Sequence, residues 1–316
     1  METLSKKTKA TAATPKVGPP LSRLGLGTAQ FGMDYGIANK QGKTDIDEVR
    51  DILAASDENG MRVIDTAPAY GDSETVLGQA LPRQHRFRIV TKTPVFGTDN
   101  IASTYGDRLR RSFRESLARL GQKRIYGLLV HNAENLLSPG GEQLMDAMIA
   151  LKTAGKVEKI GVSVYTAGQI DAILARYQID LIQLPVNLFD QRLVRDGHLS
   201  ELKKRGIEIH TRSTFLQGLL LMAPEDVPEH LETARPYLAR LRQDAERGGI
   251  SPQEAALGFV KSIAEINCVL VGVDSRGQLL ENIKAFAAGA QLPFEAYAVA
   301  DEHIVNPSLW NTTNKN

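Results

Sequence analysis

The sequence has one cysteine, almost no net charge and no long hydrophobic run. Cys268 alone cannot form an internal disulfide, which excludes a disulfide-stabilised secreted scaffold and predicts a reducing compartment. Lys and Arg number 38 against 37 Asp and Glu, so the net charge of +1 predicts no nucleic-acid partner and no anionic membrane surface. No window approaches the roughly 18 apolar residues of a membrane-spanning helix. We therefore expect a cytoplasmic protein.

Two motifs are also missing. No pair of histidines has the i, i+4 spacing of a zinc hydrolase, so we predict no metal site. The segment Gly25-Leu26-Gly27 lacks the third glycine of Gly-x-Gly-x-x-Gly, so it does not predict a dinucleotide fold of that type.

The first 20 residues differ from the rest. Residues 1–20 are rich in Lys, Thr, Ala and Pro and contain no apolar run of the length that a secretory signal needs. Such a segment cannot bury enough apolar surface to become ordered. We predict a flexible tail over residues 1–20 and one domain over residues 21–316.

Beyond residue 20 the chain alternates strand patterns with helical patterns. The short apolar runs that predict strands are Arg23–Gly27, Arg62–Thr66, Arg88–Lys92, Ile125–His131, Lys159–Val164, Leu181–Val186, Gly206–His210 and Cys268–Val273. Eight strand–helix alternations in about 270 residues suit a closed parallel barrel, which leaves no edge strand, better than an open sheet. The predicted fold is an α/β (β/α)8 TIM barrel.

Helix ends carry local signals as well. Thr44 is expected to cap a helix that begins at Asp45, and Ser251-Pro252-Gln253-Glu254 predicts a capping box with proline at the first helical position. Glycines separate several predicted helices from the strands that follow them, at Gly60, Gly121, Gly155 and Gly206.

Four polar residues lie at or just beyond the ends of consecutive predicted strands. Asp65, Lys92 and His131 fall at the ends of the second, third and fourth runs, and Tyr70 follows Asp65 by five residues. Active sites of this barrel lie at the carboxyl ends of the strands. We expect the Lys92 ammonium to lower the pKa of the Tyr70 hydroxyl from about 10. Asp65 would keep Lys92 charged, and His131 would orient a substrate oxygen.

This group suits proton transfer to or from an oxygen while its carbon gains or loses a hydride. With Gly25-Leu26-Gly27-Thr28 and Asp65-Thr66-Ala67-Pro68-Ala69-Tyr70-Gly71, it resembles the Asp-Tyr-Lys-His tetrad of the aldo-keto reductases, over roughly residues 21–290. The resemblance implies an NAD(P)(H)-dependent oxidoreductase that reduces an aldehyde, ketone or sugar to an alcohol, or the reverse. Tyr70 would be its proton donor or acceptor.

The resemblance also implies a nicotinamide dinucleotide extended across the barrel mouth. Ser163 and Gln183 would bind its carboxamide, the stretch from Arg212 to Leu219 would wrap its pyrophosphate, and a helix amino end beyond Gly272 would take the adenosine phosphate. The expected cofactor contacts are Thr28, Ser163, Gln183, Arg212, Ser213, Phe215, Gln217, Gly218, Gly272, Ser275, Arg276, Gln278, Glu281 and Asn282.

The sequence departs from the family pattern at the cofactor. Relatives specific for NADP present Lys or Arg where this chain has Gly272 and Gln278, which leaves Arg276 to pair with a 2'-phosphate. We therefore expect NAD(H) or NADP(H), with a slight preference for NAD(H). Val164 replaces an Asn that binds the carboxamide, and Arg212 replaces an aromatic residue that stacks on nicotinamide; the planar guanidinium can also stack.

The substrate is predicted only as a class. Tyr35 and several other residues near strand ends would line its pocket, and their aromatic rings suit a sugar or an aryl aldehyde equally. The expected substrate contacts are Phe31, Tyr35, Phe96, Asn132 and Trp310.

An alternative function is a dinucleotide-binding redox sensor that acts on a protein partner, as some bacterial cell-division regulators and channel subunits of this fold do. The basic tail and the insertion from Leu221 to Arg242 could contact such a regulatory partner, or could be ordinary solvated surface. Turnover of aldehydes and aldoses would separate the two functions.

Overall fold

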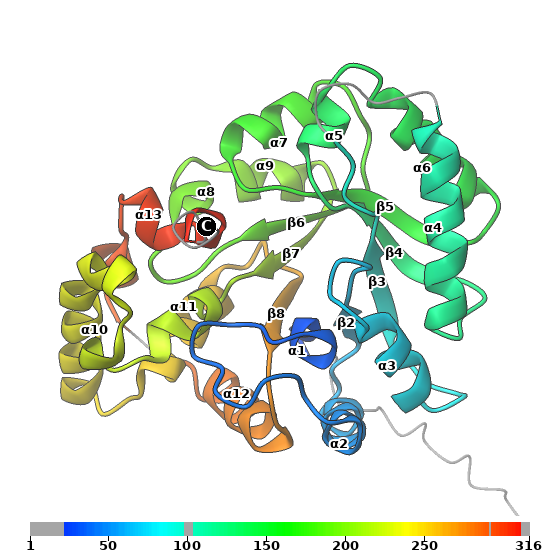
Figure 1. The fold of residues 1–316 in the computed structure, drawn as a ribbon. Helices are drawn as coiled ribbons and strands as arrows, with labels where there is room; N and C mark the ends of the chain where they lie inside the picture. Colours follow the sequence, from blue (N-terminus) through cyan, green and yellow to red (C-terminus); the bar gives the residue numbers. More distant parts are fainter. Residues whose placement is uncertain (1–21, 98–103, 291, 311–316) are drawn as a thin grey trace, which may run out of the picture.

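Eight parallel strands close into a barrel in chain order in the computed structural model, which describes residues 22–97, 104–290 and 292–310 (Figure 1). Each strand pairs with its neighbours in sequence, and the last pairs with the first. This confirms the predicted (β/α)8 barrel. The predicted tail lies outside the described residues. The strands are β1 (Leu24–Gly27), β2 (Val63–Asp65), β3 (Arg88–Lys92), β4 (Ile125–Val130), β5 (Val157–Ser163), β6 (Leu181–Pro185), β7 (Glu208–Arg212) and β8 (Cys268–Gly272).

Helices surround the barrel because each presents an apolar face to the strands. In α2, for example, Val49, Ile52 and Leu53 are buried. The helices that return the chain from one strand to the next, or follow the last, are α2 (Ile46–Glu58), α3 (Ser73–Ala80), α4 (Tyr105–Arg119), α6 (Glu142–Thr153), α7 (Ala167–Leu174), α9 (His198–Lys204), α11 (Pro252–Ser262) and α12 (Arg276–Ala288). Within the described ranges no helix combines the length and apolarity needed to cross a membrane.

Further elements lie in the loops and after α12. They are α1 (Ala29–Gly32), α5 (Glu134–Leu137), α8 (Arg192–Arg195), α10 (Arg235–Arg247), α13 (Glu302–Val305) and the 3-10 helices η1 (Leu216–Leu221), η2 (Pro224–Asp226), η3 (Glu229–Ala234), η4 (Phe294–Tyr297) and η5 (Pro307–Leu309). The predicted insertion from Leu221 to Arg242 forms η2, η3 and the first half of α10. Arg242 donates hydrogen bonds to the backbone oxygens of Leu221 and Met222, so the two ends of this segment are in contact.

The barrel interior is packed with side chains of alternate residues. Val90, Tyr126, Leu129 and Leu181 form a cluster against which Val63 packs, whereas Ile64, Ile89, Leu128 and Ile182 belong to the larger core cluster. Gly161 leaves room for this packing on β5. A Cβ atom at Gly161 would lie 1.6 Å from the Leu181 backbone oxygen on the adjacent strand.

Most of the predicted helix caps and helix ends are confirmed. Ser251 and Glu254 form the capping box at α11, and the four glycines that were expected to end helices all have positive φ. Thr44 is not a cap: the N-cap of α2 is Asp45, whose carboxylate accepts from the Asp47 amide. The seventh strand begins at Glu208, two residues later than predicted, because Gly206 (φ 74°) belongs to the end of α9.

We expect Gly161→Ala to destabilise the protein, because its methyl group would overlap the backbone of β6. Overpacking of a rigid core costs about 1 to 3 kcal/mol or more, so the midpoint of thermal unfolding should fall by several degrees. Gly168→Ala in α7 is the control, because nothing lies within 4 Å of its added Cβ. Alanine there should be neutral or slightly stabilising. Equal melting temperatures for the two variants would contradict the close packing of β5 and β6.

Candidate active site

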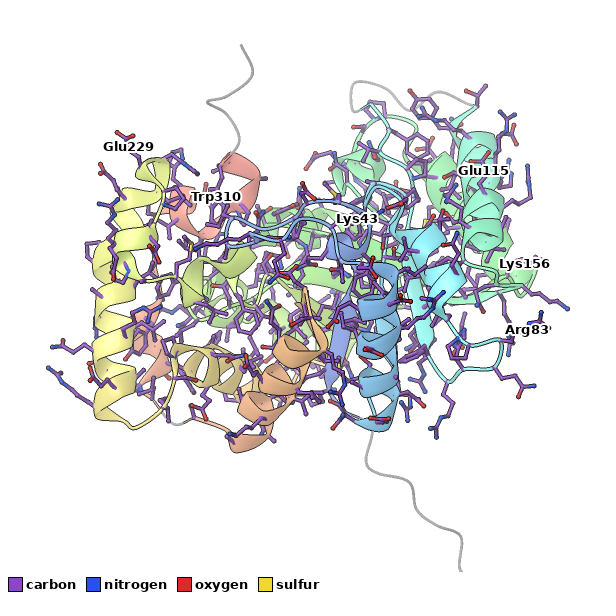
Figure 2. The ribbon with its side chains drawn as sticks, turned by 60° about the horizontal axis from the view of Figure 1, so that its bottom comes forward. Lys43, Arg83, Glu115, Lys156, Glu229 and Trp310 are labelled. Carbon is purple, nitrogen blue, oxygen red and sulfur yellow. The ribbon has the colours of Figure 1, made fainter. Side chains whose placement is uncertain are left out.

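A cavity of about 540 Å³ opens at the carboxyl ends of the strands. Figure 2 shows this side uppermost: Lys43, in the loop after β1, lies high, whereas Arg83 and Lys156, which precede β3 and β5, lie lower. Asp65, Tyr70, Lys92 and His131 all line the cavity. The barrel therefore brings together the four residues of the predicted tetrad.

The Asp65–Lys92 ion pair lies at the floor of this cavity. Lys92 Nζ is 2.9 Å from Asp65 Oδ1 and 2.7 Å from Oδ2, and the two side chains are only 1% and 5% exposed. Gln183 Nε2 donates to Asp65 Oδ1 at 2.7 Å. Burial by itself would lower the pKa of Lys92, but attraction to Asp65 and Tyr70 raises that pKa above its ordinary value. Lys92 is therefore held as a buried cation.

Tyr70 is hydrogen-bonded to this ion pair: Lys92 Nζ donates to the Tyr70 hydroxyl oxygen at 3.1 Å. Its loop is fixed by backbone packing: a Cβ on Gly32 of α1 would lie 1.9 Å from the Tyr70 backbone oxygen. Ser73, the first residue of α3, donates to the backbone oxygen of Thr28 at 2.8 Å. The ends of β1 and β2 thus hold the Tyr70 loop directly.

Burial raises the pKa of the Tyr70 hydroxyl, and the opposing effect of Lys92 does not reverse that shift. This corrects the expectation that Lys92 would bring the pKa below its ordinary value. Desolvation penalises the charged phenolate, and repulsion by the Asp65 carboxylate raises the pKa further. Tyr70 therefore keeps its proton at neutral pH.

His131 stands beside Tyr70 as a neutral ring. The two rings meet edge to face with their centroids 5.9 Å apart. Burial, with the charges of Lys92 and Arg212, lowers the pKa of His131 to about 3. Within the described part of the chain, its Nδ1 is buried without a hydrogen-bond partner.

Arg212 reaches over the same end of the cavity from β7. Its Nη2 donates to the Val164 backbone oxygen at 3.1 Å, and its guanidinium carbon lies 4.1 Å from the ring centroid of Tyr165. Sequence reasoning missed Tyr165, although it follows the fifth strand by two residues. The Arg212 guanidinium thus lies over an aromatic ring of the protein itself, and its stacking on nicotinamide stays a prediction.

The backbone after β7 is strained. Ser213, Leu216 and Gln217 have φ values of 62°, 47° and 55°, in the left-handed region that non-glycine residues avoid. Gly218 follows with φ 97°, and a Cβ there would lie 2.5 Å from that of Ala38 in the loop after β1. Two loops therefore meet across the cavity.

Most residues predicted to contact a cofactor line the cavity. They are Thr28, Ser163, Gln183, Arg212, Ser213, Phe215, Gln217, Gly218, Gly272, Gln278, Glu281 and Asn282. Ser275 and Arg276 do not line it. Ser275 Oγ caps α12 by accepting from the Gln278 amide, and the Arg276 amide donates to Glu48. Cavity residues that sequence reasoning missed include Gln30, Asn39, Tyr165, Gln253, Pro307 and Ser308.

Of the predicted substrate contacts, only Tyr35 lines the cavity. Phe31 is fully buried in the core below it, and Phe96 stacks on Tyr105 with ring centroids 4.9 Å apart. Asn132 accepts a hydrogen bond from the Glu134 amide, so it caps the turn that leads into α5. Trp310 Nε1 donates to the His303 backbone oxygen, within the terminal segment labelled in Figure 2. The placement of these four on the cavity wall was wrong.

Several known proteins are similar to this chain in sequence. The chain is 32% identical over 211 residues to the aldo-keto reductase YhdN of Bacillus subtilis, covering 64% of this chain and 61% of that protein. It is 29% identical over 218 residues to the NADH-specific methylglyoxal reductase of Escherichia coli, covering 63% and 65%. Both matches thus span less than two thirds of the relative's length. L-galactose dehydrogenase of Arabidopsis thaliana is 26% identical over 95% of each chain.

Solved structures share the fold. The aldo-keto reductase AKR11C1 of Bacillus halodurans, in its holo form, superimposes with a TM-score of 0.71 at 21% identity, over 90% of this chain and 95% of that one. A sequence profile described as the Aldo/keto reductase family matches residues 23–305, which is nearly the whole barrel. The chain therefore belongs to the aldo/keto reductase family.

Proposed function

We propose that the protein is an NAD(P)(H)-dependent oxidoreductase that converts a carbonyl group of an aldehyde, ketone or sugar to an alcohol, or the reverse. The observation that carries this proposal is the buried hydrogen-bonded chain from Asp65 through Lys92 to Tyr70 at the cavity floor, with neutral His131 beside it. Such a group can deliver one proton to an oxygen and stabilise the charge left behind.

The cavity wall fits a nicotinamide carboxamide. Gln183 lines the cavity, its Nε2 is taken by Asp65, and its Oε1 is buried without a partner among the described residues. That oxygen can accept a hydrogen bond from an amide N–H, and the Ser163 hydroxyl beside it can donate one. A bound dihydronicotinamide would supply the hydride for reduction, and its oxidised form would accept one in the reverse direction.

The residues of this chain handle the proton. Tyr70 donates its hydroxyl proton to the substrate oxygen, while the carbonyl carbon gains the hydride and becomes the alcohol carbon. The Lys92 ammonium stabilises the negative charge that develops on the Tyr70 oxygen, and Asp65 keeps that ammonium charged. The neutral His131 ring donates a hydrogen bond that orients the substrate oxygen, which a neutral imidazole can do through one N–H.

We propose a preference for NAD(H) over NADP(H). Lys92 and Arg212 are the lysine and arginine side chains that line the described cavity, and both lie near the tetrad. The expected phosphate-binding positions hold Gly272 and Gln278, and Arg276 does not line the cavity. A 2'-phosphate would therefore lack the charge-assisted hydrogen bonds that it needs.

For the substrate we propose a small carbonyl compound or a sugar. Tyr35 and Tyr165 are 38% and 37% exposed on the cavity wall, and their rings can pack against a sugar or an aryl group. The intact tetrad favours catalysis over a purely sensory role with a regulatory protein partner. A cytoplasmic location stays a prediction.

We expect Tyr70→Phe to lower turnover by at least about 100-fold, because it removes the proton donor and little else. The measurement is turnover of a panel of aldehydes and aldoses, beside fluorescence titration of the dinucleotide. Dinucleotide binding should stay within a few-fold. Tyr35→Phe is the matched control: it removes another cavity hydroxyl, one that is not hydrogen-bonded to Lys92 as that of Tyr70 is, and it should change turnover by only a few-fold. Full turnover by Tyr70→Phe would disprove the proton-donor role.

Lys92 should act through Tyr70. We expect Lys92→Met to reduce turnover strongly, and the double variant with Tyr70→Phe to lose little more than either single variant, because the two side chains act as a unit. Circular dichroism should first establish that the Lys92 variant is folded, since it leaves Asp65 without its cation. Losses that multiply in the double variant would mean that the two residues contribute independently.

The depressed pKa of His131 should appear in the pH dependence of stability. Below about pH 6.5 the unfolded chain takes up a proton at this residue, whereas the folded chain does not do so until about pH 3. The free energy of unfolding should therefore fall by an extra ~2 kcal/mol between pH 7 and pH 5, at about 1.36 kcal/mol per pH unit. In urea unfolding, His131→Asn should lack this extra loss. If the free energy of unfolding fell equally with pH in the original protein and in His131→Asn, the pKa of His131 in the folded protein would not be depressed.

A further inference from the structure

A carboxylate occupies the amino end of α12, at the end of the cavity away from Tyr70. Helices α2 and α12 lie side by side (Figure 1). Glu48 of α2 places its Oε1 2.5 Å from the backbone nitrogen of Arg276, the first residue of α12. Free amide groups at a helix amino end ordinarily attract anions such as phosphate. Here the protein supplies its own anion.

Two other amides at this helix end are also bonded within the chain. The Gln278 amide donates to Ser275 Oγ at 3.2 Å, and the Asp274 amide donates to Gln278 Oε1 at 2.8 Å. A ligand phosphate that bound any of these three amides would have to displace Glu48 or one of these bonds. The amino end of α12 is therefore poorly suited to bind a second anion.

The adjacent cavity wall is acidic or neutral. Asp274 and Glu281 line it, and an Oδ1 of Asp274 lies 3.4 Å from Asn39 Nδ2. Burial raises the pKa of Asp274 above its ordinary value. The remaining polar side chains are amides, contributed by Gln30, Asn39, Gln253, Gln278 and Asn282. This end of the cavity offers acceptors and neutral donors.

We propose that Glu48 and Asp274 make the cavity selective for the unphosphorylated ribose of NAD(H). This rests on the proposed function, in which the adenosine end of a dinucleotide lies against α12. Asp274 accepts a hydrogen bond from the ribose 2'-hydroxyl, as acidic residues do in other dinucleotide sites. Glu48 holds the first amide of α12 and repels a 2'-phosphate, which carries close to two negative charges at neutral pH.

The test is fluorescence titration of the full chain with NADH and with NADPH. Glu48→Gln keeps an oxygen that can accept from the Arg276 amide but removes the charge, so NADPH should bind about tenfold more tightly while NADH stays within about threefold. Asp274→Asn should weaken NADH several-fold and strengthen NADPH. Asp47→Asn is the matched control: it removes an exposed charge from the same helix, one residue from Glu48, and should leave both affinities unchanged.

Three outcomes would overturn the proposal. NADPH binding the original chain more tightly than NADH would show that the carboxylates do not select against phosphate. An unchanged affinity ratio in Glu48→Gln and Asp274→Asn, or an equal shift in Asp47→Asn, would show that these two positions are not responsible. Failure of the original chain to bind either dinucleotide would instead remove the proposed function, on which the inference rests.

Discussion

The buried ion pair between Asp65 and Lys92 is the interaction on which the rest of the site depends. An unpaired ammonium this deeply buried would cost several kcal/mol and would lose its proton. The barrel prevents this because β2 and β3 are parallel neighbours whose register pairs Asp65 with Val90. Lys92 lies two residues beyond Val90, so its side chain points to the same side of the sheet as that of Val90. Tyr70 is then hydrogen-bonded to Lys92, and Gln183 is hydrogen-bonded to Asp65. Fold topology thus fixes the charges before any ligand is present.

The cavity is electrically polarised by the same arrangement. Lys92 and Arg212 lie at the tetrad end, where their fields help to keep His131 neutral, whereas Asp274 and Glu281 lie toward α12. The positive end suits an oxygen that becomes negative during reaction. The acidic end suits hydroxyl and amide donors. Because the cavity spans loops from several strands, one elongated ligand can meet both environments.

The sequence predicted the barrel and the tetrad because both leave local signals: apolar runs at regular spacing, each ending in a polar residue. The sequence-based predictions were wrong where the position of a side chain depends on contacts with residues far away in the sequence. Phe31 and Phe96 follow strands as expected, yet their rings point into the core. Glu48 and Arg276 meet across 228 residues of sequence, so neither could be identified as part of one feature. The shift of β7 arose from one ambiguous glycine, Gly206, which ends a helix instead of beginning a strand.

The direction of the Tyr70 pKa shift also could not be read from residue types, because it depends on the balance of two opposing effects. Lys92 favours the phenolate, but burial disfavours it more strongly. This balance bears on the direction of the proposed reaction. A hydroxyl that keeps its proton is ready to act as an acid, as carbonyl reduction requires, whereas alcohol oxidation needs the phenolate. In the proposed reaction a protonated Tyr70 would therefore suit reduction, whereas oxidation would require a negative charge on a buried tyrosine.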